Sequence, residues 1–172
     1  MRSRQTNKPD KYIVSECVKV LRDELPYNLH IFVNSVEFIA KVIDTLKLAP
    51  EAVKVVCSTS GESRQENQRK LGNAYPIGQP SDPAKKINFY TSTCFEGCDI
   101  FDPDGVTFIV SDGRKAHTLL DISTLFTQIC GRIRDSRYKA QIVHVYSTTK
   151  YSKAVTLDEF VAATQRTLAQ AE

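Results

Sequence analysis

The sequence lacks the features that direct a chain into or across a membrane. No apolar run approaches the roughly 20 residues that a membrane-spanning helix needs. Residues 1–10 are polar and contain no apolar signal core. We therefore expect a cytoplasmic protein without a membrane partner, in which residues 1–10 are disordered.

The cysteines and histidines are too scattered to suggest a disulfide framework or a metal site. The chain has five cysteines, an odd number, and three histidines. Cys94 and Cys98 have three residues between them rather than the two of a zinc knuckle, and no second pair completes a site. His30 lies in an apolar strand pattern, where a structural role is expected. We expect reduced thiols and no bound metal.

A phosphate-binding loop is also absent from the sequence. The pattern Gly-x-x-x-x-Gly-Lys-Ser/Thr, whose backbone amides and lysine cradle the phosphates of ATP, occurs nowhere in the 172 residues. The sequence therefore contains no loop of its own for the phosphates of ATP.

The composition is that of a folded domain. Apolar residues make up 41% of the chain and charged residues 25%, which are ordinary proportions for a globular protein. The net charge of +3 is small, so it supports nucleic-acid binding only weakly. A length of 172 residues fits one domain with a sizeable core, and we expect residues 1–172 to form it.

Strand patterns and helix patterns alternate along the chain. Continuous apolar runs predict strands at residues 29–33, 53–57, 87–90, 106–110 and 141–146. Helical periodicity predicts helices at residues 13–25, 36–46, 64–71, 119–129 and 156–168. Residues 74–84, rich in proline, form the one clear loop or insertion. Buried strands separated by helices predict an α/β fold, a mostly parallel central sheet with helices on both faces.

Polar side chains follow four of the predicted strands at the points where they end. These clusters are Asn34-Ser35, Cys57-Ser-Thr-Ser60, Thr91-Ser-Thr93 and Ser111-Asp112. Right-handed crossovers bring the carboxyl ends of parallel strands to one edge of the sheet, where ligands bind in open α/β folds. Capping or turn chemistry explains any single cluster. All four together on one rim indicate a binding site.

Two segments carry the most specific pattern in the chain. The first is Thr91-Ser-Thr-Cys-Phe-Glu-Gly97-Cys-Asp99-Ile100, in which a strand ends in hydroxyls and a glycine-containing loop with a carboxylate follows. The second is Gln128-Ile-Cys-Gly131-Arg132-Ile-Arg134, in which an apolar helix ends in closely spaced guanidiniums. Hydroxyls, backbone amides and planar guanidiniums all suit phosphate oxygens. The pair indicates a site that grips phosphates from two directions.

In this order the two segments resemble motifs V and VI of the second RecA-like lobe of superfamily 2 helicases and translocases. Thr91, Gly97 and Asp99 match motif V, and the Gln-x-x-Gly-Arg that starts at Gln128 matches the start of motif VI. The segment Ile31-Phe-Val-Asn-Ser35, with the helix pattern after it, resembles motif IV. The resemblance extends over residues 29–150. It implies a RecA-like three-layer sandwich.

Motif VI shows one departure from the family pattern. The commonest form has a second arginine three places after the first, where this chain has Asp135. The nearby guanidiniums belong instead to Arg134 and Arg137. The shorter Gly-Arg-x-Arg form is similar to that of some viral and mobile-element helicases, such as origin-binding types. Which arginine would face the γ-phosphate of ATP therefore stays open.

The resemblance implies roles for individual residues on the nucleotide side. Gly97 would let the backbone approach the nucleotide, and Asp99 would accept from a ribose hydroxyl or couple the two sites. Gln128, Arg132 and Arg134 would face ATP and Mg²⁺ held mainly by a separate N-terminal RecA-like lobe. The resemblance therefore implies an incomplete unit, either a fragment of a longer protein or a subunit that needs a partner lobe. An arginine supplied in this way stabilises the charge that develops on the transferred phosphoryl group.

Other residues are expected to contact a DNA or RNA strand. Hydroxyls at the carboxyl rim would donate hydrogen bonds to backbone phosphates, a contact that positions a strand without reading its sequence. The candidates are Thr91 and, more weakly, Ser35, Ser58 and Thr59.

Two other functions compete with a motor lobe. The run from Val53 through Cys57 to Arg64 resembles the loop of cysteine phosphatases, in which a thiolate and an arginine hold a phosphoryl group. Here the spacing between Cys57 and Arg64 is one residue longer than in that family, which would move the guanidinium out of the cradle. The third hypothesis is a non-catalytic nucleic-acid binding or interaction module of the same fold.

Overall fold

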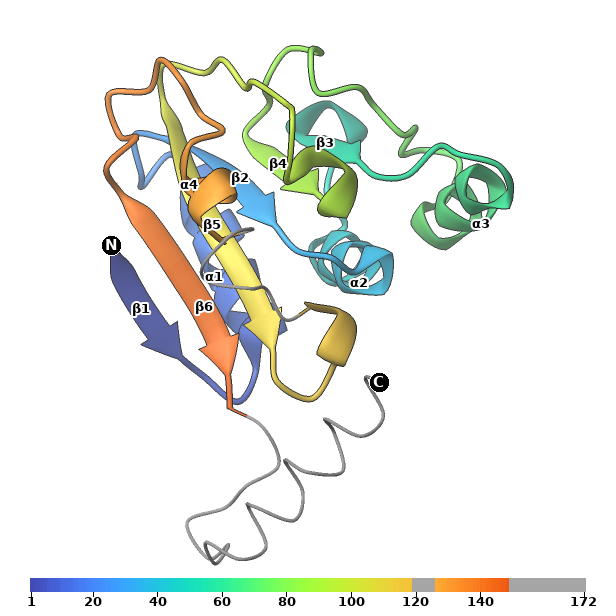
Figure 1. Ribbon diagram of the computed structural model, residues 1–172, viewed down its shortest axis with the longest axis horizontal. Coiled ribbons are helices and arrows are strands. Elements are labelled where there is room, and N and C mark those ends of the chain that lie inside the picture. The colour runs from blue at the N-terminus through green and yellow to red at the C-terminus, as the bar shows by residue number, and fades with distance from the viewer. Residues whose placement is uncertain (119–125, 149–172) are drawn as a thin grey trace, which may run out of the picture.

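A six-stranded sheet forms the centre of the computed structural model, which describes residues 1–118 and 126–148. The strand order is β1-β6-β5-β2-β4-β3, and every neighbouring pair is parallel (Figure 1). The strands are β1 (Arg2–Gln5), β2 (Asn28–Phe32), β3 (Val53–Val56), β4 (Ile87–Tyr90), β5 (Gly105–Asp112) and β6 (Ile142–Ser147). All carboxyl ends therefore meet at one edge, as the polar clusters predicted.

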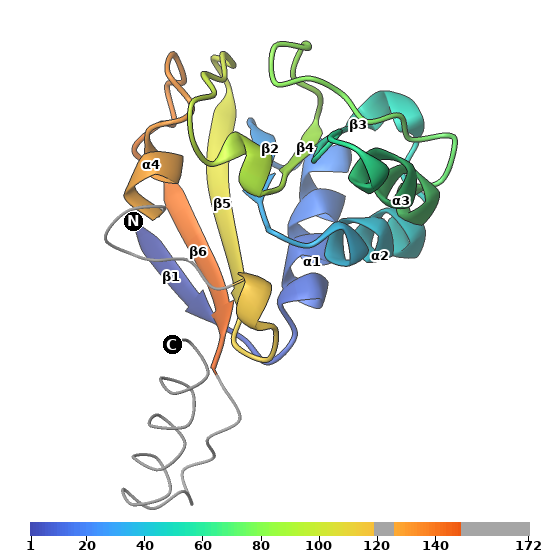
Figure 2. The same ribbon diagram turned by 45° about the vertical axis from the view of Figure 1, so that its right-hand side comes forward.

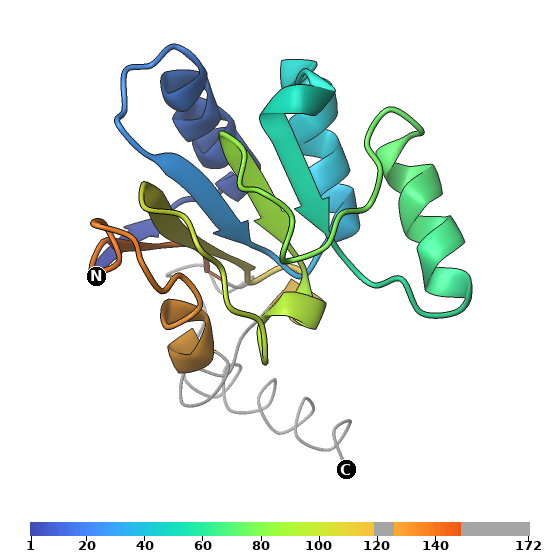
Figure 3. The same cartoon turned by 90° about the horizontal axis from the view of Figure 1, so that it is seen from above.

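Helices cover both faces of this sheet. On one face α1 (Pro9–Leu21), α2 (Val36–Leu46) and α3 (Glu62–Leu71) lie in a row, with α2 packed between the other two (Figure 2). The short helix α4 (Thr127–Cys130) and the 3-10 turn η2 (Ser92–Cys94) lie on the opposite face (Figure 3). The predicted α/β three-layer sandwich is confirmed. Within the described ranges, no helix is long and apolar enough to cross a membrane.

The core is divided between the two faces of the sheet. Ile31 of β2 belongs to the cluster beneath α1 and α2, whereas its neighbour Phe32 belongs to the cluster beneath η2 and α4. Successive side chains of a strand point to opposite faces, so a strand buried on both sides is mostly apolar. This is why the central strands appear in the sequence as continuous apolar runs. The few polar residues in these strands, such as His30 and Asn88, are buried and hydrogen-bonded.

Helix α2 illustrates how the local sequence defines an element. Ser35 has an extended backbone, and its hydroxyl oxygen accepts the N–H of Phe38 at 3.2 Å, which caps the first turn. Four apolar side chains spaced along one face are buried, namely Phe38, Ile39, Val42 and Ile43. The helix ends at Lys47, whose φ of 47° is left-handed. The predicted range, residues 36–46, is confirmed.

The first ten residues differ from the expectation of disorder. Arg2–Gln5 forms the edge strand β1, which pairs with β6 from Arg2 opposite Val143 to Gln5 opposite Tyr146. All four side chains of β1 are exposed, so the strand depends on backbone hydrogen bonds and leaves no apolar pattern in the sequence. Helix α1 then begins at Pro9, earlier than predicted, because proline suits the first turn of a helix.

Some predicted elements fall partly or wholly outside the described residues. Of the helix predicted at residues 119–129, the structure describes only the last turn, α4. The helix predicted at residues 156–168 lies outside the described ranges. The loop at residues 74–84 has no helix or strand, and the Lys54 ammonium of β3 holds it by donating to the carbonyl oxygens of Pro80 and Asp82 at 3.0 and 2.6 Å.

Candidate functional site

The two motif segments, which residues 101–127 separate in the sequence, lie side by side in the fold. Ile100 and Ile133 form an isolated parallel bridge. The Ile100 N–H donates to the Arg132 carbonyl at 2.9 Å, and the Arg134 N–H donates to the Ile100 carbonyl at 3.0 Å. Both isoleucine side chains are buried beneath the sheet face that carries α4, which anchors the pairing to the core.

The pairing brings together the charged side chains singled out in the sequence. Arg134 Nε lies 2.7 Å from Asp99 Oδ1, and both side chains are about half exposed. Arg132 is partly buried, and its Nε and Nη1 donate to the carbonyl oxygens of Gln128 and Cys98 at 2.9 and 3.0 Å. Asp99, Arg132 and Arg134 therefore belong to one surface region. The guanidinium of Arg132 is directed by two carbonyls, and that of Arg134 by a carboxylate.

Gly97 lies at the turn before this pairing and adopts a left-handed conformation. Its φ is +72°, and a Cβ at this position would meet no atom within 4 Å. Glycine is therefore required by the backbone angle and not by crowding. The open space above the turn leaves the backbone accessible.

Gln128 carries a polar atom without a partner. Its Oε1 is buried and accepts no hydrogen bond within the part of the chain that the structure describes. Such an orphaned acceptor costs about 1–3 kcal/mol. A donor from a bound molecule or a partner domain would recover this energy. Gln128 lies on α4, and its backbone carbonyl accepts from Arg132 Nε four residues later.

The predicted nucleic-acid contacts separate into buried and exposed groups. Ser35 and Thr91 are buried, and the Ser35 hydroxyl caps α2, so the capping role is favoured over contact with phosphate. Ser58 is partly exposed and Thr59 is exposed after the end of β3. Ser92 and Thr93, which follow Thr91 in the same polar cluster, are exposed and present their hydroxyls to solvent. They were not among the predicted phosphate contacts.

Side chains join the rim loops to one another. The Asn34 amide donates to the His117 carbonyl at 2.9 Å and accepts the Ser92 N–H at 3.4 Å. The Thr91 N–H donates to Val56 O at 3.0 Å, which joins the end of β4 to the end of β3. The loops after β2, β3, β4 and β5 thus form one continuous edge, as the position of the polar clusters predicted.

Asp112, at the end of β5, is the most strongly paired carboxylate of this edge. It accepts hydrogen bonds from Ser147 Oγ at 2.7 Å and from Arg114 Nε at 3.1 Å. Burial raises the pKa of Asp112, but the hydrogen bonds from Arg114 and Ser147 outweigh it and lower the pKa to about 2. Asp112 borders a hollow of about 440 Å³ at the start of α1 and α2. The sequence indicated a polar strand end here but not its ion pair.

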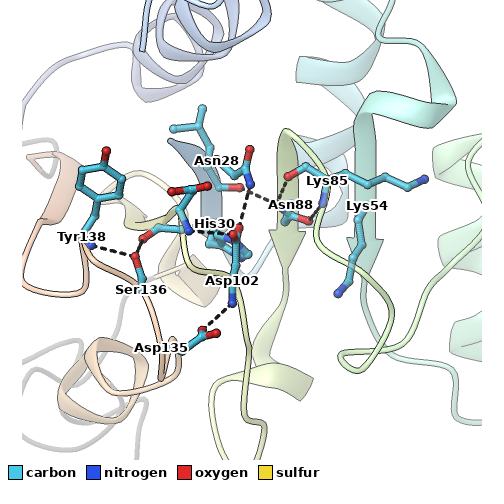
Figure 4. Close-up of polar contacts among 12 residues, drawn as sticks. Asn28, His30, Lys54, Lys85, Asn88, Asp102, Asp135, Ser136 and Tyr138 are labelled. Atoms are coloured by element: carbon cyan, nitrogen blue, oxygen red, sulfur yellow. Dashed lines mark hydrogen bonds and ion pairs between the residues drawn. The ribbon is translucent and has the colours of Figure 1, made fainter. Parts of the chain in front are cut away.

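Beneath the motif segments lies a buried network that sequence reasoning did not find. His30 of β2 is fully buried, and its Nε2 lies 2.7 Å from Asp102 Oδ2 (Figure 4). Its Nδ1 lies 2.9 Å from the Tyr90 hydroxyl. Burial lowers the pKa of His30, against the opposing effect of Asp102, so the ring is neutral and donates from Nε2 while accepting from Tyr90. A structural role for His30 was expected, but its partners came from distant segments.

The protein should lose stability when the pH falls below about 6.5. Because the pKa of native His30 lies below its ordinary value of 6.5, the unfolded chain binds a proton that the folded chain does not. One such proton contributes a slope of up to about 1.4 kcal/mol per pH unit. We expect urea unfolding between pH 7 and 5 to show this slope and His30→Gln to reduce it.

His144 is the matched control for this measurement. Burial also lowers its pKa, and its Nε2 lies 3.1 Å from Ser111 Oγ, so it contributes in the same direction. The His144→Gln variant should keep the larger part of the slope because His144 is only half buried. An unchanged slope in His30→Gln would show that His30 titrates normally in the folded state.

The environment of Cys57 disfavours a phosphatase. The thiol is buried at the end of β3, and burial raises its pKa to about 11. Catalytic cysteines require the opposite shift, because the thiolate is the nucleophile. Arg64 is exposed on α3, and no contact joins it to Cys57 in the described residues. Nor do any three His, Cys, Asp or Glu side chains gather as a metal site in those ranges.

Comparison with known proteins identified no relative of this chain. Protein-family models, curated proteins and solved structures were compared with the chain, and none matches. The helicase interpretation therefore depends on the motif residues and on how the fold arranges them.

Proposed function

We propose that this chain is the second motor lobe of an ATP-dependent nucleic-acid helicase or translocase. The observation that carries the proposal is the backbone pairing of Ile100 with residues 132–134, which, with the side-chain contact of Arg134 to Asp99, places Asp99, Arg132 and Arg134 together. Segments resembling motifs V and VI would need this adjacency to couple a nucleotide to a strand. The polar edge formed by the strand ends supports the same interpretation.

On the nucleotide side, the residues fit a phosphate-bearing ligand supplied from outside the chain. The Asp99–Arg134 pair is exposed, and exposed ion pairs contribute only about 0–1 kcal/mol, so a phosphate could replace the carboxylate at small cost. Gln128 Oε1, orphaned within the described residues, needs a hydrogen-bond donor, which ionised phosphate oxygens do not supply, so the guanidiniums and not this atom support phosphate binding. ATP, as substrate, would supply the phosphoryl group, and Arg132 and Arg134 would stabilise its developing charge.

ATP and Mg²⁺ would be held mainly by a first RecA-like lobe, on the same polypeptide or on a partner. The reason is the missing phosphate loop, since the chain has no Gly-x-x-x-x-Gly-Lys-Ser/Thr sequence. We assign the chain to the cytoplasm, where its five free cysteines would remain reduced.

On the nucleic-acid side, exposed hydroxyls at the carboxyl edge would contact backbone phosphates. Ser58 and Thr59 after β3, and Ser92 and Thr93 after β4, are accessible for this contact. Thr91 is buried, and its backbone ties the loop to β3, so its role would be to position its neighbours. Such contacts hold a DNA or RNA strand without reading its sequence.

The isolated chain is expected neither to hydrolyse ATP nor to separate a duplex. The physical reason is that no loop of amides and no lysine holds the phosphates in line. ATP turnover should appear only in a protein that also contains the first lobe, and nucleic acid should stimulate it. Phosphate release measured for the chain alone and for the two-lobe protein tests this. Robust hydrolysis by the pure isolated chain would refute the proposal.

A non-catalytic module of the same fold is the second candidate. The observation in its favour is that Arg132 already donates to two backbone carbonyls, which is what a purely structural arginine would do. In such a module the two-lobe protein would bind nucleic acid without turning over ATP. The effect of replacing Arg132 on turnover and on stability, measured in parallel, separates the two functions.

A further inference from the structure

Asp135 occupies the position where the commonest motif VI has its second arginine, and its side chain is engaged within the chain. Asp135 Oδ1 accepts the backbone N–H of Asp102 at 2.7 Å (Figure 4). Asp135 is exposed, whereas Asp102 is buried. The carboxylate thus reaches inward from the surface to the segment that carries Asp99.

This hydrogen bond continues the pairing of the two motif segments. In a parallel ladder that contains the Ile100–Arg132 and Arg134–Ile100 bonds, the next donor is the Asp102 N–H and the next acceptor is the Arg134 carbonyl. The Asp135 carboxylate takes the place of that carbonyl. Hydrogen bonds to a charged acceptor are roughly twice as strong as neutral ones. The last link of the pairing is therefore charge-assisted.

The other end of this link is fixed in the core. Asp102 Oδ2 accepts from His30 Nε2 at 2.7 Å and from Asn28 Nδ2 at 3.0 Å. Asp102 Oδ1 accepts the N–H of Asp104 at 3.0 Å. With both carboxylate oxygens engaged and His30 fully buried, Asp102 has no freedom to follow a displaced neighbour. Asp135 is therefore connected, through Asp102 and His30, to β2 at the centre of the sheet.

We propose that Asp135 is a positioning residue, which together with Asp102 and His30 holds residues 132–134 against residues 98–100. Its effect is to keep the guanidiniums of Arg132 and Arg134 in fixed directions. The consequence for ATP turnover depends on the proposed function, but the mechanical link does not. In this chain Asp135 is a replacement with a role of its own and is not a lost arginine.

Backbone hydrogen exchange of the isolated chain tests the link without reference to any activity. Asp135→Ala removes the acceptor, so exchange of the Asp102 amide should accelerate about 10- to 100-fold, with smaller increases at Ile100 and Arg134. Asp135→Asn keeps a side-chain carbonyl in the same place but loses the charge, so its exchange rates should lie between those of wild type and Asp135→Ala. Unchanged exchange at all three amides in Asp135→Ala would overturn the proposal.

Asp104→Ala is the matched control for these variants. Asp104 is a carboxylate of the same segment, and it pairs with Arg137 at 2.9 Å on the surface. Its ion pair is exposed and lies beyond the pairing of Ile100 with residues 132–134, so it contributes little, and the exchange rates at Ile100, Asp102 and Arg134 should remain those of wild type. An equal acceleration in Asp104→Ala would mean that any lost charge loosens the segment, and the specific role of Asp135 would be refuted.

ATP turnover by the two-lobe protein shows whether Asp135 positions the arginines or merely occupies a position where an arginine would work better. Asp135→Arg restores the commoner family residue but offers no acceptor to the Asp102 N–H. If Asp135 is a positioning residue, ATP turnover should fall at least about tenfold in Asp135→Arg, whereas Asp135→Asn should retain most of the wild-type turnover. A rise above wild type in Asp135→Arg would overturn the proposal. If wild type shows no turnover, the proposed function fails, and hydrogen exchange still decides the role of Asp135.

Discussion

Replacing Arg132 with alanine should reduce ATP turnover by the two-lobe protein about 10³- to 10⁵-fold. An arginine that reaches a nucleotide held on another lobe stabilises charge that develops only in the transition state. ATP binding should persist, because the phosphate loop would lie in the first lobe. Phosphate release and nucleotide affinity, measured on the same preparation, check both halves of this expectation.

Two further variants show whether the effect belongs to the guanidinium. Arg132→Lys keeps the positive charge but loses the planar fork that contacts the carbonyls of Gln128 and Cys98, so it should remain strongly impaired. Arg137→Ala removes an exposed guanidinium that pairs with a surface carboxylate, Asp104, and should retain turnover. Wild-type turnover in Arg132→Ala would exclude Arg132 from the reaction.

Arg134 is the alternative arginine for the same role. Its partner Asp99 is exposed, so its side chain is freer to turn toward a nucleotide than the partly buried Arg132. If Arg134 takes this role, Arg134→Ala should show the large loss of turnover, with only a small loss in Arg132→Ala. That result would assign the stabilisation of the transferred phosphoryl group to Arg134 in place of Arg132. Equal losses would indicate that both guanidiniums contact the transferred phosphoryl group.

Replacing Asp102 with alanine should lower the free energy of unfolding by about 3–5 kcal/mol. The substitution leaves the His30 ring N–H without an acceptor in a site of zero exposure and also releases Asn28 and the Asp104 amide. A domain of this size is stable by about 5–15 kcal/mol, so the loss is a large fraction of the total. Urea denaturation of the isolated chain measures it directly.

The stability effect of Asp102 can be compared with that of its neighbour. Asp104→Ala breaks a surface ion pair and should cost less than about 1 kcal/mol, although the same charge is removed from the same segment. Asp102→Asn keeps one carbonyl oxygen and should lie between the two. If Asp102→Ala unfolded within about 1 kcal/mol of wild type, the buried network would contribute little, and the anchor proposed for Asp135 would be lost with it.

Most of the central elements could be predicted from the sequence because their signals are local. The apolar run of β4 and the capped, periodic pattern of α2 matched their predicted ranges, since burial on both faces or on one stripe imposes the pattern directly. The edge strand β1 could not be predicted in this way, because its four side chains are exposed and its stability comes from β6, far along the chain.

The candidate site was predicted in part for the same reason. Spacing identified Asp99, Arg132 and Arg134 as candidates, but nothing local in the sequence indicates that residues 98–100 pair with residues 132–134. Ser35 and Thr91 were selected as accessible hydroxyls because they follow strands, and the fold buries both. Position along a strand is a local property, whereas accessibility depends on what packs above it.

The sequence alone determined the alternation of apolar runs and helical faces, hence the layered α/β architecture, and it determined that no phosphate loop is present. Only the tertiary structure decided which groups meet, as with Asp135 and the Asp102 amide, or His30 and Tyr90. The physical reason is distance along the chain. Periodicity reports what each residue requires of its surroundings, while a buried hydrogen bond between remote segments exists only once the sheet has brought them together.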